Sequence, residues 1–266
     1  MSENKNLVDI ALRATALARA EILLHYGQKI SIDWKPDHTP VTIADRNAEM
    51  AVRKFLEVET PEFGLIGEEF GSTRPGSEYQ WIVDPIDGTK SFVRGVPLFG
   101  TILALWHRNS PILGVIALPA LNSVLHAAQG MGAWVDGVRV GVSSVDSLSK
   151  ATVLSGTVNT MEQKGFGPGF TRLRQGAQLY RGWGDCYGYY MVACGRAEIM
   201  VDPVVSIWDI AAMPIIFAEA GGHFSEIDGN TNILDAQGAP RALSEGYTAI
   251  ASNGKLHDQA IKTLAS

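Results

Sequence analysis

The chain has 266 residues, of which 46% are hydrophobic, so it can bury a sizeable core in one or two domains. Its formal net charge of −6 and the absence of a basic run argue against nucleic acid as a partner and leave room for a small phosphorylated metabolite. The sequence shows no apolar leader and no apolar segment long enough to span a bilayer, so we expect a cytoplasmic protein that does not bind membranes.

The first part of the chain is expected to hold two helices separated by a loop. Residues 4–26 carry apolar side chains at three- and four-residue steps, which predicts an amphipathic helix. Residues 33–40 are polar and contain two prolines, which predicts a loop. A second helix is predicted over 42–58, because Thr42 and Asp45 form a capping pattern at its start. Asp45 can therefore be a first-turn acid facing the helix dipole or a carboxylate beside a metal.

Pairs of acidic residues follow two short apolar segments that are typical of buried strands. These are Glu68 and Glu69 after residues 65–66, and Asp84 and Asp87 after residues 81–83. In open α/β sheets, binding sites form at the carboxyl ends of strands, so both pairs are candidates for one site. The alternative for the glutamate pair is a solvated acidic loop.

The second of these segments continues into a turn that suits an anion. Pro85 cannot donate to a strand ladder and is expected to end the strand. Gly88 permits a close backbone approach, and the N–H groups after it can form an anion-binding nest. Asp84 and Asp87 repel each other unless protons or cations intervene, and Mg2+ takes carboxylate and phosphate oxygens as ligands. The stretch predicts metal-assisted hydrolysis of a phosphate ester, with an ordinary surface turn as the alternative.

The rest of the first half predicts successive strands with short connections. They are expected at residues 101–106, 111–117, 124–128 and 133–135. Asp136-Gly137 is a strong two-residue hairpin signal. We therefore predict that residues 1–145 form an α+β half, with two helices against a mostly antiparallel sheet.

Residues 146–266 alternate strands and helices, which predicts a smaller α/β half. The strands are expected at 152–155, 178–181, 198–201, 223–227 and 247–251, and the helices at 186–194, 208–220 and 256–264. Cys186 and Cys194 would lie roughly 12 Å apart along one helix, too far for a disulfide, which suits a reduced compartment. Asp209 is either a first-turn acid or a carboxylate that completes a metal site.

Three motifs along the chain resemble those of the inositol monophosphatase superfamily of Mg2+-dependent, lithium-sensitive phosphatases. They are Gly67-Glu68-Glu69, Asp84-Pro85-Ile86-Asp87-Gly88-Thr89, and Trp208-Asp209-Ile210-Ala211-Ala212 followed by Glu219-Ala220-Gly221-Gly222. The resemblance covers nearly the whole chain. It implies a layered αβαβα sandwich that forms one compact catalytic unit and assembles as a homodimer.

The resemblance also implies a set of metal ligands for two or three Mg2+ ions per site. Glu68, Asp84 and the carbonyl of Ile86 would hold the first ion. Asp84, Asp87 and Asp209 would hold the second, so that Asp84 bridges the two.

Further roles implied by the resemblance concern the phosphate and the water that attacks it. The N–H groups of Gly88 and Thr89 would bind the phosphate. Thr89, with Asp45 behind it, would orient the attacking water. Glu69 would support catalysis through water or a third, weakly bound Mg2+.

Within the superfamily, three segments are most similar to histidinol-phosphate phosphatases. They are Lys35–Asp45, Phe92–Pro97 and Arg181–Tyr189. The expected reaction is hydrolysis of L-histidinol phosphate to L-histidinol and phosphate, a step of histidine biosynthesis. Asp185 and Asp202 are candidates to face the ammonium and imidazole of this substrate, because carboxylates favour cationic groups. Alternatively, Asp185 is a helix N-cap and Asp202 is a turn acid at the end of a strand.

Other functions stay open at this point. An inositol-1-phosphate phosphatase, or a phosphatase of broad specificity for small metabolites, would use the same metal acids. A non-catalytic binding protein is disfavoured because every motif acid is present. The role of Arg94 is not defined by the sequence.

Overall fold

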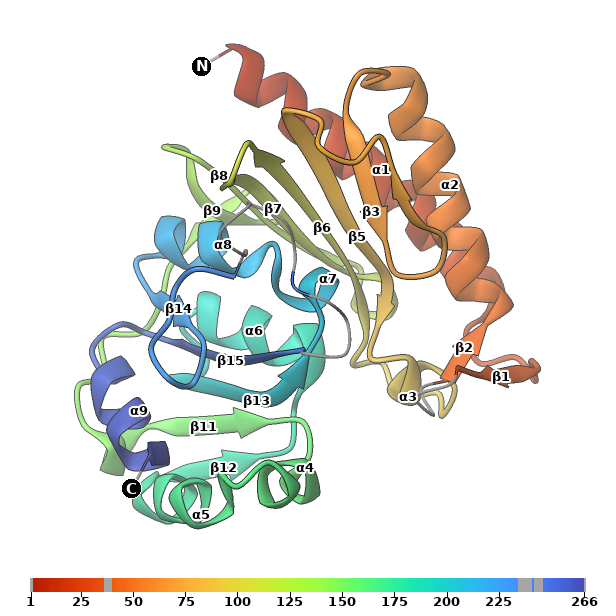
Figure 1. The fold of residues 1–266 in the computed structure, drawn as a ribbon. Coiled ribbons are helices and arrows are strands. Elements are labelled where there is room, and N and C mark those ends of the chain that lie inside the picture. Colours follow the sequence, from red (N-terminus) through yellow and green to blue (C-terminus); the bar gives the residue numbers. More distant parts are fainter. Residues whose placement is uncertain (1, 36–39, 234–240, 242–245, 266) are drawn as a thin grey trace.

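The protein forms five alternating layers of helices and sheets (Figure 1). The structure is a computed structural model that describes residues 2–35, 40–233, 241 and 246–265. The outer helices of the first layer are α1 (Ser2–His25) and α2 (Ile43–Glu59). The middle helices are α6 (Asp185–Ala193), α7 (Ile207–Ile210) and α8 (Met213–Ala220). The last layer holds α4 (Val158–Gln163), α5 (Gly167–Gly176) and α9 (His257–Ala265). This arrangement confirms the predicted αβαβα sandwich.

An eight-stranded sheet lies between the first and the middle helices, in the order β10-β9-β8-β7-β6-β5-β3-β4. Its strands are β3 (Gly64–Gly67), β4 (Gly71–Thr73), β5 (Tyr79–Asp87), β6 (Gly100–His107), β7 (Ser110–Leu118), β8 (Ser123–Ala128), β9 (Gly132–Val135) and β10 (Val138–Val140). All neighbours pair antiparallel except β3 with β5. The prediction of a mostly antiparallel sheet is therefore confirmed.

A five-stranded mixed sheet separates the middle helices from the last layer, in the order β12-β11-β13-β15-β14. Its strands are β11 (Thr152–Ser155), β12 (Leu179–Arg181), β13 (Ile199–Val205), β14 (His223–Ser225) and β15 (Tyr247–Ser252). Side chains from both sheets, such as Ile102 and Met200, meet in one apolar core around the middle helices. Because this core joins the two parts of the chain, the division at residue 145 stays a prediction.

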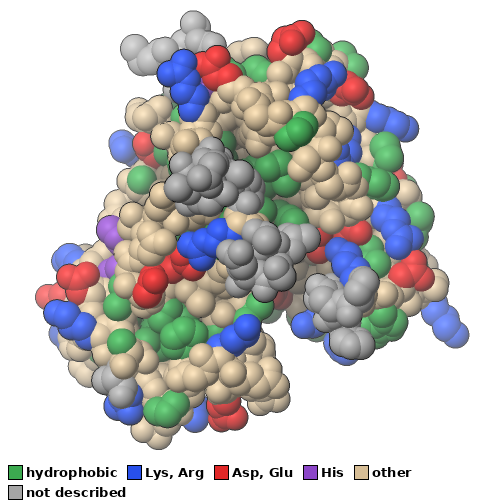
Figure 2. Space-filling view, viewed as in Figure 1, with side chains coloured by type: hydrophobic (Ala, Val, Ile, Leu, Met, Phe, Trp, Pro, Cys, Tyr) green, Lys and Arg blue, Asp and Glu red, His purple; other side chains and the backbone are tan. Residues whose placement is uncertain are grey.

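Short elements connect these layers. They are α3 (Thr89–Phe92), η1 (Pro119–Leu121) and η2 (Leu148–Lys150). Among the described residues, no helix combines the length and the hydropathy that a membrane span requires. On the face seen in Figure 2, basic and acidic side chains are interspersed.

Strand β5 is longer than predicted because Pro85 lies in a β-bulge and does not end the strand. Asp84 pairs with Ile102 and Asp87 with Gly100, so two residues of β5 oppose one residue of β6. A bulge tolerates the missing N–H of proline. The extra residue also reverses the alternation of the strand: Ile82 faces the middle helices, whereas Ile86 faces α1 and α2.

Two further predictions about elements were wrong. The segment 33–40, predicted as a loop, is in strands at both ends: β1 (Ile32–Trp34) includes residues 33 and 34, and β2 (Pro40–Thr42) begins at residue 40. The two strands pair antiparallel, and residues 36–39 lie outside the described part of the chain. The helix predicted over 208–220 is two helices, α7 and α8. Pro214 lies in the first turn of α8, where proline is compatible with a helix start but not with its interior.

Candidate active site

Three carboxylates meet where β5 reaches the middle helices. Ligand atoms of Asp84, Asp87 and Asp209 all lie within 4.8 Å of one another. Asp84 precedes the bulge of β5 and Asp87 follows it, so the reversed alternation brings both acids to the side of the sheet where α7 carries Asp209. Two acids three residues apart would face opposite sides of a regular strand. The bulge therefore makes the cluster possible.

The carboxylates of this cluster can be ionised together only if protons or cations offset their mutual repulsion. Burial raises the pKa of both Asp84 and Asp87 well above the ordinary value of 3.8, and the neighbouring acids raise it further. Burial also raises the pKa of Asp209 to about 6. Oδ1 of Asp84 is buried without a hydrogen-bond partner among the described residues. An unpartnered buried carboxylate oxygen beside two further acids fits a hard divalent cation such as Mg2+.

Asp209 is a capping residue of helix α7 and also a member of the carboxylate cluster. Its Oδ2 accepts the N–H of Ser206 at 2.7 Å, and the two residues form a capping box at the start of α7. This bond holds the carboxylate in place with respect to Asp84 and Asp87. Helix capping and metal binding are therefore compatible at this position.

The glutamate pair lies beside the cluster and is not a solvated acidic loop. The side chains of Glu68 and Glu69 are 18% and 6% exposed. Nζ of Lys35 donates to Glu68 at 2.6 Å and to Glu69 at 2.7 Å. Burial raises the pKa of Glu68 to about 7; Lys35 opposes this rise, and Asp209 adds to it. Lys35 thus places a positive charge beside these two acids.

The turn after the cluster brings Thr89 to Asp45. Oγ1 of Thr89 lies 2.9 Å from the carbonyl oxygen of Ile86 and 3.3 Å from Oδ1 of Asp45. Gly88 adopts φ +85°, a left-handed conformation that glycine takes without strain. Helix α3 begins at Thr89, so the N–H of Thr89 belongs to the first turn, where helices leave donors unpaired.

Asp45 also caps helix α2, as the sequence pattern predicted. Its Oδ2 accepts the N–H of Thr42 at 2.8 Å and the Thr42 hydroxyl at 2.6 Å, while that hydroxyl accepts the N–H of Ala44. Burial raises the pKa of Asp45 to about 6. Capping the helix therefore leaves Oδ1 of Asp45 available to Thr89, and the two interpretations of Asp45 are compatible.

Asp185 lies against the turn at Gly88. A Cβ built on Gly88 would lie 3.0 Å from Oδ2 of Asp185, so the carboxylate is adjacent to the proposed phosphate-binding turn. The helix N-cap is Gly184 and not Asp185, which lies in the first turn of α6. Burial raises the pKa of Asp185, and the nearby Lys90 opposes this rise.

Asp202 lies inside β13 and is not a turn acid at a strand end. It is 8% exposed and accepts the hydroxyl of Tyr189 at 3.0 Å and the N–H of Gly156 at 3.4 Å. Burial raises its pKa to about 7, with a further contribution from Asp185. With both oxygens bonded within the protein, Asp202 is less available to a ligand than Asp185.

Sequence reasoning missed two residues at this site, Lys35 and Glu49. Lys35 lies in a polar segment without periodicity, and only its inclusion in the similar segment Lys35–Asp45 could have drawn attention to it. Glu49 is fully buried beneath Glu69 and accepts its N–H at 2.7 Å. Arg94 is exposed and donates to the carbonyl of Lys90.

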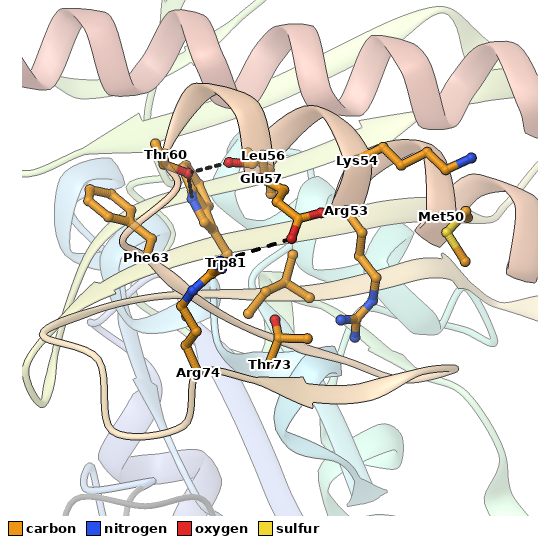
Figure 3. A pocket seen from close by; sticks show the side chains of 12 residues that line it. Met50, Arg53, Lys54, Leu56, Glu57, Thr60, Phe63, Thr73, Arg74 and Trp81 are labelled. Carbon is orange, nitrogen blue, oxygen red and sulfur yellow. Dashed lines mark hydrogen bonds and ion pairs between the residues drawn. The ribbon is translucent and has the colours of Figure 1, made fainter.

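A separate cavity of about 160 Å3 lies between α2 and the strands β3, β4 and β5 (Figure 3). Its walls include Arg53, Arg74 and Trp81 but none of the predicted site residues. The carboxylate cluster, and not this cavity, is therefore the candidate active site.

The layered fold places three carboxylates beside a glycine turn, and this arrangement of oxygen atoms and backbone N–H groups fits a metal ion and a phosphate ester. Comparison with known proteins identifies the family. The model of the Inositol monophosphatase family matches residues 3–266, and the chain belongs to this family.

Individual relatives extend this comparison. The chain is 40% identical to a histidinol-phosphatase of Chlorobaculum parvum, over 93% of this chain and 97% of that protein. It is 39% identical to a histidinol-phosphatase of Mycobacterium tuberculosis, over 99% of both chains. Among solved structures, an inositol monophosphatase from Zymomonas mobilis superposes with a TM-score of 0.84 at 28% identity, and covers 98% of each chain.

Proposed function

We propose that this protein hydrolyses L-histidinol phosphate to L-histidinol and phosphate, with Mg2+ as its cofactor. The observation that carries the phosphatase chemistry is the cluster of Asp84, Asp87 and Asp209 beside the turn at Gly88. The similarity to two histidinol-phosphatases, at 39% and 40% identity over nearly the full length of the chain, supports the choice of substrate.

The proposed metal ligands are Glu68, Asp84, the carbonyl of Ile86, Asp87 and Asp209. Bound cations of this kind supply positive charge that neutralises a phosphate dianion, lowers the pKa of water and stabilises the leaving oxygen. The protein's contribution is to hold these oxygen atoms in place before substrate arrives. The capping bond of Asp209 and the bulge around Asp84 and Asp87 serve this purpose.

The proposed phosphate ligands are the N–H groups of Gly88 and Thr89. The Thr89 hydroxyl has one hydrogen, which it can donate to Ile86 or to Asp45, so its oxygen stays free to accept a hydrogen bond from water. This bond would orient the water towards the phosphorus. Glu69 would act through solvent, because Lys35 and the buried Glu49 already hold its carboxylate and its N–H.

Asp185 is the proposed recognition residue for the cationic part of histidinol phosphate. Its carboxylate adjoins Gly88, so a substrate held by its phosphate at that turn can bring a primary ammonium within reach. Asp202 would contribute charge and hold Tyr189, without direct contact being required.

The experiment that tests this function compares two substrates. Phosphate release with Mg2+ is measured from histidinol phosphate and from inositol-1-phosphate, and kcat/KM is compared. A preference of at least 100-fold for histidinol phosphate, about 2.7 kcal/mol of transition-state discrimination, is expected. A preference for inositol-1-phosphate would retain the metal site but reject the proposed role of Asp185.

The second candidate is an inositol-1-phosphate phosphatase, or one of broad specificity for small metabolites. It is favoured by the family match and by the structural similarity to the Zymomonas mobilis protein. Three expectations from the sequence stay predictions with either substrate: a homodimer, inhibition by lithium and a cytoplasmic location.

A further inference from the structure

A fully buried glutamate lies beneath the turn that carries Glu68 and Glu69. This residue is Glu49 of helix α2, with 0% of its surface exposed. Its Oε2 accepts the N–H of Glu69 at 2.7 Å, and its Oε1 accepts the N–H of Phe70 at 3.2 Å. One carboxylate therefore binds two consecutive backbone donors of the short turn between β3 and β4. Because a carboxylate with two N–H bonds strongly prefers one orientation, the turn has little freedom to rotate.

Arg53 completes this arrangement one helical turn further along α2. Its Nε donates to Oε1 of Glu49 at 2.7 Å, and its Nη2 donates to the carbonyl of Gly71. The guanidinium carbon also lies 5.9 Å from the ring centre of Phe70. The pair thus bonds the backbone of residues 69, 70 and 71 in succession. Arg53 neutralises the buried charge of Glu49, which would be strongly destabilising if left unpaired.

The positions of Glu49 and Arg53 explain why the Gly67-Glu68-Glu69 motif begins with glycine. A Cβ at position 67 would lie 2.0 Å from Oε1 of Glu49 and 2.7 Å from Nη2 of Arg53. No side chain fits there while Glu49 keeps its bonds. The φ of Gly67 is not in the left-handed region, so space and not backbone conformation requires glycine at this position.

The turn that the pair holds faces the carboxylate cluster. The N–H of Glu68 donates to the carbonyl of Val83 at 3.3 Å, so Glu68 begins its turn beside the residue that precedes Asp84. The charge of Glu68 accordingly contributes to the raised pKa of Asp84. Glu68 reaches the cluster from a turn of only three residues between Gly67 and Gly71. Any rotation of that turn would carry the Glu68 carboxylate away from Asp84.

We propose that Glu49 and Arg53 are positioning residues that fix the turn so that Glu68 can bind metal. They do not contact the substrate. The proposal rests on the role of Glu68 as a metal ligand, given above. It predicts that the pair sets the affinity for Mg2+, because groups that orient metal ligands typically change metal affinity 10- to 100-fold when they are lost.

The test is Mg2+ binding measured by titration calorimetry on the intact protein, which needs neither substrate nor turnover. Glu49→Gln keeps the size of the side chain but replaces one acceptor oxygen with a donor. We expect its dissociation constant for Mg2+ to rise at least about 10-fold. The same shift should appear in the Mg2+ concentration that gives half-maximal activity, while activity at saturating Mg2+ recovers.

The matched control is Glu219→Gln. Glu219 also accepts two backbone N–H groups, those of Gly130 at 2.7 Å and Gly132 at 2.6 Å, but it holds the turn between β8 and β9. Its substitution should lower thermal stability and leave Mg2+ affinity unchanged. Equal weakening of Mg2+ binding in both variants would overturn the proposal, because it would indicate general loosening of the fold.

An unchanged affinity in Glu49→Gln would also overturn the proposal while leaving the metal site intact. If Glu49→Gln does not fold, Arg53→Lys provides the test, because it keeps the positive charge but loses the bonds of the guanidinium group to Glu49 and Gly71. An unchanged Mg2+ affinity in Arg53→Lys would refute the positioning role. A wild-type protein that binds no Mg2+ would refute both this proposal and the metal assignment on which it rests.

Discussion

Asp45 bonds the hydroxyl of Thr89 through one carboxylate oxygen and caps helix α2 through the other. The two functions can be separated by substitution. Thr42→Ala removes the hydroxyl of the cap and should lower stability by about 1 kcal/mol. The N–H of residue 42 still bonds Asp45 in this variant, so the loss of activity should be small. Asp45→Asn should lower kcat by roughly 100-fold or more, because it weakens the group that orients Thr89. Thermal unfolding and phosphate release measure the two effects, and equal activity losses in both variants would contradict the role of Asp45.

Asp84 is expected to be the most important single residue for activity, since it belongs to both proposed metal sites. Asp84→Asn should reduce kcat/KM by at least about 100-fold, as expected when a group that stabilises transition-state charge is lost. The same change should raise the melting temperature of the metal-free protein, because it replaces an acid whose ionisation is opposed by burial and by the neighbouring carboxylates with an amide that does not ionise. Asp136→Asn, on the hairpin turn, is the control for activity. Near-normal turnover of Asp84→Asn would show that the bridging role is wrong.

The metal-free protein should lose stability as the pH rises from about 4 to 7. Burial raises the pKa of Asp45 and Asp209 from 3.8 to about 6, and that of Asp202 to about 7. The folded state therefore binds protons more tightly than the unfolded state in this window, and that stabilisation disappears as the pH rises through the folded pKa values. Binding of Mg2+ requires the deprotonated acids, so it should restore stability most at high pH.

The measurement is the difference in melting temperature with Mg2+ and with a chelator, at pH 5.5 and pH 8. This difference isolates the effect of the acids on stability from that of His257. Burial lowers the pKa of His257 to about 4, so His257 lowers the stability of the fold as the pH falls below 6.5. His257 is bonded to Ser225 and Ser252, away from the acids, and contributes equally with and without metal. A larger effect of Mg2+ at pH 5.5 than at pH 8 would contradict the assignment.

Asp185→Ala should separate substrate recognition from chemistry. We expect KM for histidinol phosphate to rise roughly 10-fold, as for the loss of one charge-assisted hydrogen bond, while KM for an aryl phosphate without a cationic group stays unchanged. Asp146→Ala, in the segment between the two sheets, is a control for a change in net charge. Equal losses on both substrates would show that Asp185 acts on the turn at Gly88 and not on the substrate.

Much of this site could be predicted from the sequence because its acids lie at the ends of elements. The spacing of Thr42 and Asp45 predicts a helix start, and the acid pairs at 68–69 and at 84 and 87 follow short apolar runs. Such signals depend on neighbours within a few residues. No local pattern links Asp209 to these acids. Its place in the same site was predicted only from the resemblance to the superfamily.

What could not be predicted depends on contacts between distant segments. Asp45, Glu49 and Arg53 recur every four residues, a spacing that usually marks an exposed ion pair on a helix surface. Only the tertiary fold shows that this face of α2 is buried beneath the turn at Glu69. The bulge at Pro85 was missed for a similar reason, because a proline is a strand breaker unless the partner strand shifts its register.

Pro85 has a consequence for how the molecule folds. A hairpin-like pair of long strands such as β5 and β6 can in principle slip by one residue, and such a slip would turn the acids away from their partners. At the bulge, a slipped alignment would place a residue without an N–H group opposite a carbonyl that needs one. The correct pairing also gives the carbonyl of Pro85 its bond from the Thr101 hydroxyl at 2.8 Å. The proline therefore favours the register of β5 and β6 that brings the acids of the carboxylate cluster together over registers shifted by one residue.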